Sequence, residues 1–552
     1  MTRMPSDSSL AAPRSPRLGW ALTAVLLAAV TAELGTLIYR SLDWPLVQDA
    51  PLMNYMAWRL DQGDTPYRDM LDMNFPGAYA VHWAAIRVFG TGDRGWRLFD
   101  LAWLGLTAGA MIVCCRRFGW AGRLAAALLL AVFHVEGGPL RTGQREFVMV
   151  APLLLACHFA AGYAERGGWG RLLLAGMLAG FGATIKPVAL LFWVGLGVAA
   201  FVFARRRGRC PWLAACGVGL GGLAPLAAAA AWVVAMGGWQ AFEEMLTDLL
   251  PLYSSIRRIS RLELASSVFD SRYVVALAAV TAAGYARLAL RQRRIDARSG
   301  LLVLGILYGL AHHLLQGKGW QYHLYLFVGF LCAACAAASY REEDEGAAAL
   351  GATRVENTNL TNYRRISRIS SKKREIGGIP GNSWNSCYRR LPPWATCVAL
   401  TAAALVAGRA ILLNNDHGLP EKNRLMATLV QDIASRVQPG DTVQVLDITY
   451  GGLDALLRLK LRQPTRFIYD FPFFMDPGRP YVQTLRRQFI EQLRAGTPRL
   501  IVIFERGGGW PGKDYNRLAA FGELQQFLDQ QYLPPSDGPE YRVYTRKERA
   551  QP

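Results

Sequence analysis

The sequence predicts a polytopic α-helical membrane protein of about eleven transmembrane helices with a C-terminal α/β domain. First, the 552 residues are 52% hydrophobic and only 18% charged, whereas soluble domains carry roughly 25% charged residues. Second, apolar runs of membrane-spanning length alternate with short basic clusters. Third, the mean hydropathy of only +0.15 leaves room for soluble segments, and residues 414–552 have the pattern of one.

The formal net charge of +20 does not indicate a nucleic-acid partner. The basic residues lie mostly in short clusters between apolar runs, which is the pattern of membrane topology rather than of a DNA-binding face. The nine Cys fall mostly inside apolar segments without paired C-x-x-C spacing. Buried hydrophobic packing therefore explains them better than a metal site or a disulfide framework.

The transmembrane helices are predicted from runs of about 20 mostly apolar residues, the length that a bilayer requires. The first run has no convincing cleavage site and is followed by further spans, so we interpret it as an uncleaved anchor. The predicted spans are 18–39, 96–115, 121–135, 146–164, 171–185, 188–204, 212–236, 271–290, 299–315, 323–340 and 393–413.

The orientation follows from the loops, which alternate between a basic set and a mixed or acidic set. The basic set includes "RRFGWAGR", "RRRGR" and "RQRRIDAR". Because cytoplasmic loops carry the excess of Lys and Arg, the N-terminus is predicted in the cytoplasm. The acidic loop 40–95 and residues 414–552 are then extracytoplasmic, in a multi-pass protein of the cell inner (plasma) membrane.

Four parts follow along the chain. Residues 1–340 form the membrane module with its outer first loop 40–95. Segment 341–390 is polar and rich in Ser and Arg, and is predicted to be a disordered cytoplasmic linker. Residues 391–413 form the last transmembrane helix, and 414–552 form a small extracytoplasmic domain.

The C-terminal domain alternates helical and strand-like patterns. "NRLMATLVQDIASRV", "YVQTLRRQFIEQL" and "LAAFGELQQFLDQQYL" have helical spacing, whereas "DTVQVLDI" and "RLIVIFER" are rich in β-formers. This alternation predicts a partly parallel sheet. "GGGW" at 507–510 is predicted to be a loop without a phosphate-binding role, because it lacks the spacing of a nucleotide motif.

Seven polar residues stand out in the outer loops or at the outer ends of spans. Ionisable groups at membrane depth are costly and indicate function by default. One face that carries carboxylates and several cations predicts a site for an anionic, lipid-borne substrate. The seven residues are Asp49 and Asp72 in the first loop, Arg145 and Glu146, Lys186, and Lys318 with His323.

Structural roles could account for each of them as well. Asp49 precedes "APLMNYMAWRL" and could be a helix N-cap. Arg145 and Glu146 could form an interfacial pair, and the two lysines could reach lipid headgroups. For other polar residues, structural roles are the favoured interpretation: solvated turns for Asp61, Asp64 and Asp69, a helical ion pair for Arg97 and Asp100, and packing for His312 and His313.

The first loop carries a further pattern, "PYRDMLDMNFPGAYAVHW" after a long acidic stretch. Together with "GQREFVMVAPLLLA", "LAGFGATIKP" and "QGKGWQYHLY" it resembles the glycosyltransferase-C superfamily. The branch is that of protein O-mannosyltransferases and lipid A aminoarabinose transferases, a glycosyltransferase family 39-like group. The resemblance covers about residues 18–340 and includes Asp49, Tyr55, Gly63, Pro66, Tyr67, Asp69, Asp72, Pro76, Gly77 and Tyr79.

The resemblance implies a glycosyltransferase-C type fold and transfer of a hexosyl or pentosyl group at the outer face. The donor would be a polyprenyl-phosphate sugar, the acceptor a hydroxyl of a glycan, lipid or protein, and Asp49 the general base. Ala50 and Asn74 depart from the pattern, where many members carry an acid and a Lys. The donor phosphate would then be met by cations elsewhere in the site, with Tyr55, Asp72, Glu146 and His323 also in contact with substrate; the candidate cations are Lys186, Lys318 and Arg145.

No metal or other cofactor is implied, and the absence of a nucleotide-binding motif fits a lipid-linked donor. Two alternatives stay open at this point. A transporter or flippase would require charges at the bilayer midplane and inverted repeats, whereas these charges lie at span ends and no convincing repeat is present. A non-catalytic protein of envelope assembly is the second alternative.

Overall fold

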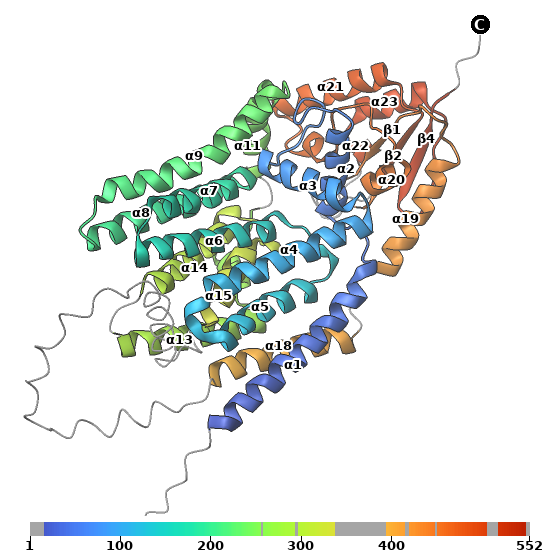
Figure 1. The fold of residues 1–552 in the computed structure, drawn as a ribbon. Coiled ribbons are helices and arrows are strands. Elements are labelled where there is room, and N and C mark those ends of the chain that lie inside the picture. Colours follow the sequence, from blue (N-terminus) through green and yellow to red (C-terminus); the bar gives the residue numbers. More distant parts are fainter. Residues whose placement is uncertain are drawn as a thin grey trace, which may run out of the picture.

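A computed structural model describes residues 16–255, 258–292, 296–336, 394–413, 419–447, 450–504 and 517–547. The predicted linker 341–390 and the predicted loop 507–510 lie outside the described residues. What is described consists of a helical bundle and a C-terminal domain that sits on one end of the bundle (Figure 1).

The bundle helices coincide with the predicted spans. The described residues contain 8 helices that are long and apolar enough to cross a membrane, and three shorter apolar helices complete the predicted set. The polytopic fold class is thereby confirmed. The helices are α1 (Pro16–Arg40), α4 (Asp93–Cys114), α5 (Gly119–Glu136), α6 (Arg145–Arg166), α7 (Trp169–Ile185), α8 (Leu190–Arg206), α9 (Pro211–Ala235), α13 (Arg272–Gln292), α14 (Ala297–Gln316), α15 (Tyr325–Cys335) and α18 (Trp394–Leu412).

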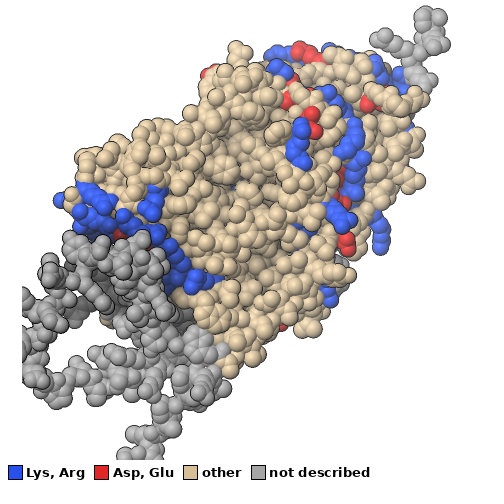
Figure 2. All heavy atoms as spheres, in the orientation of Figure 1, with Lys and Arg blue, Asp and Glu red and all other residues tan. Residues whose placement is uncertain are grey.

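Charge divides the molecule along the bundle axis. Lys and Arg gather at the end remote from the C-terminal domain, and a broad band nearly without charge lies between them and that domain (Figure 2). The basic end includes Arg116 and Arg117 after α4, Arg166 at the end of α6, and Arg205 and Arg206 at the end of α8. An uncharged band flanked by polar ends is what a bilayer-spanning bundle requires.

Glycines allow α7 and α9 to pack at close range. A Cβ on Gly176 would lie 2.1 Å from the Val218 carbonyl oxygen, and one on Gly221 would lie 2.2 Å from that of Leu173. Small residues let two helix backbones approach each other in a membrane, where the packing itself drives association. This contact holds α7, which ends directly before Lys186, against α9.

Short helices cover the domain-side end of the bundle. The first loop forms α2 (Asp49–Asp61) and α3 (Pro76–Phe89), which starts with Pro at its first position, where the missing N–H leaves no bond unmade. The loop after α9 forms α10 (Trp239–Glu244), a π-helical turn η5 (Met245–Leu249), α11 (Leu250–Ser255) and α12 (Arg261–Ser267). Short 3₁₀ turns complete the layer, namely η1 (Ser41–Asp43), η3 (Pro139–Arg141), η4 (Pro187–Ala189) and η6 (Gln321–Leu324), whereas η2 (Arg116–Phe118) lies at the opposite, basic end of the bundle.

The C-terminal domain is α/β with one four-stranded sheet in the order β1-β2-β4-β3. The strands β1 (Val443–Leu446) and β2 (Leu500–Phe504) pair in parallel and are wholly buried, as their continuous apolar runs predict. The antiparallel strands β4 (Tyr541–Thr545), which pairs with β2, and β3 (Ser536–Asp537), which forms one edge of the sheet, were not predicted from the sequence. The helices are α19 (Leu419–Ala434), α20 (Gly452–Leu459), η9 (Phe471–Phe474), α21 (Pro480–Gly496), α22 (Arg517–Ala520) and α23 (Gly522–Gln531).

One carboxyl of this domain should make its stability depend on pH. The Asp454 side chain in α20 is 2% exposed and pairs with Arg458 at 3.1 Å, and burial raises its pKa to about 6. Because the folded-state pKa exceeds the ordinary value of 3.8, the unfolding free energy is highest below that value and falls as the pH rises through 6. The difference corresponds to about 3 kcal/mol at most.

Asp454→Asn should therefore raise the thermal midpoint at pH 8, and the gain should shrink at pH 5. Tryptophan fluorescence of the detergent-solubilised chain measures both midpoints. Asp537→Asn is the matched control, since its side chain is 74% exposed in the same domain. An equal gain at the two pH values would contradict the proposed titration.

Candidate functional site

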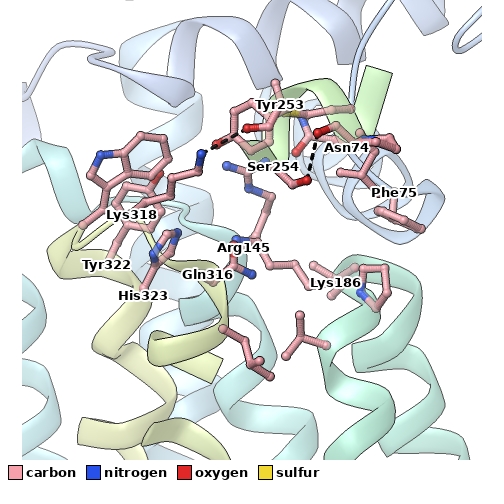
Figure 3. Close-up of a pocket in the computed structure, with 18 of the residues that line it drawn as sticks. Asn74, Phe75, Arg145, Lys186, Tyr253, Ser254, Gln316, Lys318, Tyr322 and His323 are labelled. Carbon is pink, nitrogen blue, oxygen red and sulfur yellow. Dashed lines mark hydrogen bonds between the residues drawn. The ribbon is translucent and has the colours of Figure 1, made fainter. Parts of the chain in front are cut away.

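A cavity of about 450 Å³ opens at the domain-side end of the bundle. Its walls come from the first loop at 73–75, the start of α6, the turn between α7 and α8, α11, and the turn between α14 and α15. Figure 3 shows Arg145, Lys186, Lys318, Tyr322 and His323 around it. The described lining residues include four cations, the fourth being Arg258, and no carboxylate.

Asp49 lies beside this cavity and is held by Arg145. Its Oδ2 accepts a hydrogen bond from Arg145 Nη2 at 2.7 Å, with 29% of the Asp49 side chain exposed. Asp49 is the first residue of α2, after Gln48, and no side-chain cap hydrogen bond is made at this helix start. The ion pair, and not helix capping, therefore fixes the carboxylate, which keeps access to solvent.

Glu146 forms the buried centre of the site. Its Oε1 pairs with Lys186 Nζ and lies 3.6 Å from His312 Nε2 and 3.5 Å from His323 Nε2. Its Oε2 has no hydrogen-bond partner among the described residues. Because a buried carboxylate must be compensated by charge, Glu146 holds Lys186 at the cavity wall. His312 is buried as expected for a packing role, and it also lies beside the Glu146 carboxylate.

Lys318 is positioned by its glycine neighbours. Gly317 and Gly319 adopt φ of 67° and 69°, which turns the chain sharply on both sides of Lys318. The ammonium donates to the Tyr253 carbonyl at 3.0 Å and lies 4.7 Å from the centre of the Tyr253 ring. Burial raises the pKa of the Tyr253 hydroxyl. Lys318 is therefore fixed against the cavity wall, which lipid-headgroup contact alone would not require.

Asp72 is a buried structural hub instead of a lining residue. Its carboxylate accepts hydrogen bonds from the Asn74 backbone N–H at 2.9 Å and side-chain amide at 3.0 Å, from Tyr79 at 3.0 Å, and from Tyr469 at 2.9 Å. The four bonds occupy the lone pairs of the carboxylate. Asp72 therefore shapes the loop that presents Asn74 to the cavity, and Tyr469 extends this network into the C-terminal domain.

Tyr55 does not line the cavity. Its hydroxyl donates to the Leu461 carbonyl at 3.1 Å and accepts from the Gln463 N–H at 3.0 Å, which ties α2 to the C-terminal domain. The expectation of a solvated turn at Asp64 was wrong, because this residue is 5% exposed and pairs with Arg59. Asp64 also pairs with Arg462 of the C-terminal domain. The sequence could not place this pair or the contacts of Tyr55, since their partners are about 400 residues away.

The structure brings five of the predicted residues to the cavity: Arg145, Glu146 through its partner, Lys186, Lys318 and His323. Sequence reasoning missed others in the loop 237–270, namely Tyr253, Ser254 and Arg258. A usable signal was present, because "SSIRRISR" is basic in a loop that the charge bias assigns to the outer side. Basic residues in a loop that should carry few of them indicate a functional cation.

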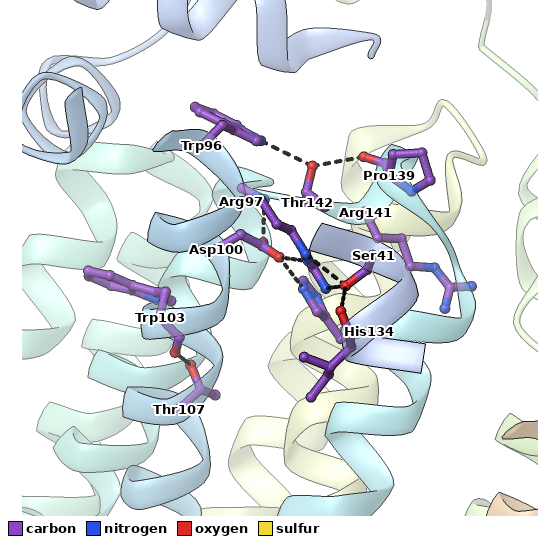
Figure 4. Close-up of polar contacts among 12 residues, drawn as sticks. Ser41, Trp96, Arg97, Asp100, Trp103, Thr107, His134, Pro139, Arg141 and Thr142 are labelled. Carbon is purple, nitrogen blue, oxygen red and sulfur yellow. Dashed lines mark hydrogen bonds and ion pairs between the residues drawn. The ribbon is translucent and has the colours of Figure 1, made fainter. Parts of the chain in front are cut away.

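A second polar network supports the start of α6 from within the bundle (Figure 4). Asp100 pairs with Arg97, accepts from His134 Nε2 at 2.9 Å, and accepts from the Gly143 N–H at 2.7 Å. Arg97 also donates to Ser41 Oγ at 3.0 Å. The expected Arg97–Asp100 pair is present, and through Gly143 it holds the turn that leads into Arg145.

Asp100→Asn should lower the unfolding free energy by about 3–5 kcal/mol, because it leaves the buried Arg97 uncompensated. The thermal midpoint of the purified chain measures the loss. Asp270→Asn, at an exposed position before α13, is the control and should leave the midpoint unchanged. An Asp100→Asn variant as stable as the control would show that the network contributes little.

Known proteins resemble this chain in two ways. A family model described as dolichyl-phosphate-mannose-protein mannosyltransferase matches residues 74–234, which contain the start of α6 and Lys186. No curated protein matches the chain in sequence. The matched segment is the part of the bundle that forms one side of the cavity.

Solved structures match over nearly the whole chain. The crystal structure of ArnT from Cupriavidus metallidurans bound to undecaprenyl phosphate has a TM-score of 0.55 at 13% identity, covering 95% of this chain and 98% of that one. The apo form of ArnT gives 0.55 at 15% identity, covering 96% and 98%. The chain therefore has a glycosyltransferase-C type fold, and its resemblance to the membrane glycosyltransferases of that superfamily is confirmed.

Proposed function

We propose that this protein is an integral membrane glycosyltransferase that moves a sugar from a polyprenyl-phosphate donor to an acceptor hydroxyl on the outer face of the membrane. The observation that carries the proposal is the cavity at the end of the bundle. It combines lysine and arginine side chains with apolar walls, beside a carboxylate that is partly exposed. A lipid phosphate with a prenyl chain is complementary to such a cavity, because its anionic group can meet the cations and its chain can meet the apolar walls.

The cations would meet the donor phosphate. Lys186, Lys318, Arg145 and Arg258 all line the cavity, and apolar side chains such as Leu250 lie beside them. The binding of undecaprenyl phosphate by ArnT, which shares the fold, supports a lipid phosphate as the ligand. Lysine and arginine also stabilise the charge that develops on a leaving phosphate.

Asp49 would act as the general base. The acceptor oxygen attacks the anomeric carbon, the bond from that carbon to the phosphate oxygen breaks, and the acceptor proton passes to the Asp49 carboxylate. The polyprenyl phosphate leaves with the bonding electron pair and one additional negative charge. A positioned carboxylate contributes typically 10²–10⁴ to such a step, and the Arg145 contact at 2.7 Å orients this one.

The test compares donors. The purified chain in detergent receives radiolabelled hexose or pentose on undecaprenyl phosphate, or the same sugar on a nucleotide, together with an envelope extract as acceptor. Release or transfer of label from the lipid donor, lost in Asp49→Asn, is the expected result. Transfer from the nucleotide donor alone, or no turnover of any lipid donor, would contradict the proposal.

Orientation gives an independent prediction. Cys210 is exposed in the basic turn between α8 and α9, whereas Glu523 is exposed in α23 of the C-terminal domain. In a background without other cysteines, a membrane-impermeant maleimide should label Glu523→Cys in intact cells and Cys210 only after permeabilisation. The reverse pattern would invert the proposed topology and move the reaction to the cytoplasmic side.

A further inference from the structure

A second cavity lies between the first loop and the C-terminal domain. It has a volume of about 490 Å³ and is lined by the α2 end of that loop and by residues 462–466 of the C-terminal domain. Four arginines line it, Arg59, Arg68, Arg462 and Arg466. Asp64 and Asp69 are its two described acidic lining residues, so the lining carries two more positive than negative charges.

The arginines keep donors available although each has a partner. Arg59 and Arg462 pair with the two oxygens of Asp64, and Arg68 pairs with Asp69 at 2.9 Å. The Arg462 side chain is 47% exposed, so solvent and a ligand can reach it. The five N–H groups of a guanidinium exceed what one carboxylate accepts, and the remaining groups can bind a second oxyanion.

Arg466 provides the strongest indication of a ligand. One Nη donates to Glu244 at 2.5 Å, yet the buried Nε has no hydrogen-bond partner among the described residues. An unmade hydrogen bond at a buried, charged donor costs free energy that a bound oxyanion would recover. Glu244 neutralises part of the charge of Arg466, so the cavity has a net positive charge of one to two.

We propose that this second cavity is a binding site for a phosphate ester, separate from the donor cavity, that joins the first loop to the C-terminal domain. A phosphate monoester carries about −1.5 to −2 charges near pH 7 and offers three acceptor oxygens. Arginine is the residue best suited to bidentate contact with such a group. The ligand would bridge Arg68 of the loop and Arg462 of the domain.

Occupancy of this site would stabilise the loop that also lines the donor cavity. Asp69 lines the second cavity, and Met73 lines the first, four positions further along the same loop. Between them, the Leu71 N–H donates to the Arg466 carbonyl at 2.7 Å, and the Met73 N–H donates to the Tyr469 hydroxyl at 3.2 Å. A ligand bound by Arg466 would therefore stabilise the backbone of residues 69–73.

The experiment is calorimetric titration of the full chain with glucose 1-phosphate in detergent, and with phosphatidic acid in nanodiscs as the second arm. Arg462→Gln and Arg466→Gln should each weaken binding about tenfold or more, the usual worth of a charge-assisted hydrogen bond. Arg487→Gln, an exposed arginine of α21 outside the cavity, is the matched control and should bind like the native chain. Binding of the soluble ester alone identifies a soluble ligand, and binding of the lipid alone identifies a headgroup.

Two further variants separate this site from the donor cavity. Lys186→Met and Asp49→Asn should bind glucose 1-phosphate, the soluble probe, like the native chain, so the result does not depend on whether sugar transfer is observed. Binding that is lost in Lys186→Met but kept in Arg462→Gln would assign the ligand to the first cavity and overturn the proposal. Absence of binding in both arms, or equal binding by all arginine variants, would also overturn it. If Arg466→Gln does not fold, Arg462→Gln alone decides the test.

Discussion

Asp49→Asn should lower the turnover number for sugar transfer by roughly 10²–10⁴-fold, the usual contribution of a positioned general base. The amide has nearly the shape of the carboxylate and can still accept a hydrogen bond from Arg145, but it cannot take the acceptor proton. Donor affinity should change little, since Asp49 lies beside the cavity and is not among its described lining residues. Steady-state transfer from a lipid-linked donor, with direct measurement of donor binding, separates the two quantities.

The control for this prediction is Asp61→Asn. Asp61 ends the same helix and pairs with Arg87, with 30% of its side chain exposed. Its replacement removes one carboxylate from the same loop without touching the cavity, so transfer should stay within about twofold, as expected for a surface ion pair. Equal losses in the two variants would show that the loop needs its charge in general and that Asp49 has no special role.

The membrane fold was predictable because its determinants are local. A span requires only a run of apolar residues, and the orientation of a loop depends on its own Lys and Arg content. The runs at 146–164 and 212–236 accordingly became α6 and α9 with boundaries within one or two residues. The antiparallel strand β3 was missed because it is two exposed residues long and has no apolar pattern of its own.

The site was predictable in part for the same reason. Polar residues at the same end of several spans must lie in one layer, so Arg145, Lys186 and Lys318 converge on one cavity without any knowledge of their contacts. The roles of Tyr55 and Asp72 depended instead on partners in the C-terminal domain, Gln463 and Tyr469. A sequence pattern carries no information on such pairs unless the packing of the two modules is known.

Replacement of Lys186, directly after α7, should have the second largest effect on the turnover number. The leaving phosphate gains negative charge as the sugar departs, so a cation beside it stabilises the transition state more than the bound donor. Lys186→Met should therefore lower the turnover number by roughly 10²–10³, the usual effect of removing one group that stabilises developing charge. Donor affinity should fall much less, and Lys186→Arg should restore only part of the rate, because a planar guanidinium does not replace an ammonium.

Lys186 is also the ion-pair partner of the buried Glu146, so its loss has a structural consequence that must be separated from catalysis. Lys186→Met alone leaves a buried carboxylate near His312 and His323 and should lower the thermal midpoint. Adding Glu146→Gln removes that charge, so the double variant should regain stability while its turnover stays low. Lys547→Met, at an exposed position of the C-terminal domain, controls for the loss of a lysine as such. Recovery of turnover together with stability in the double variant would show that Lys186 acts only by compensating Glu146, and the donor phosphate would then have to be met by Arg145, Arg258 and Lys318.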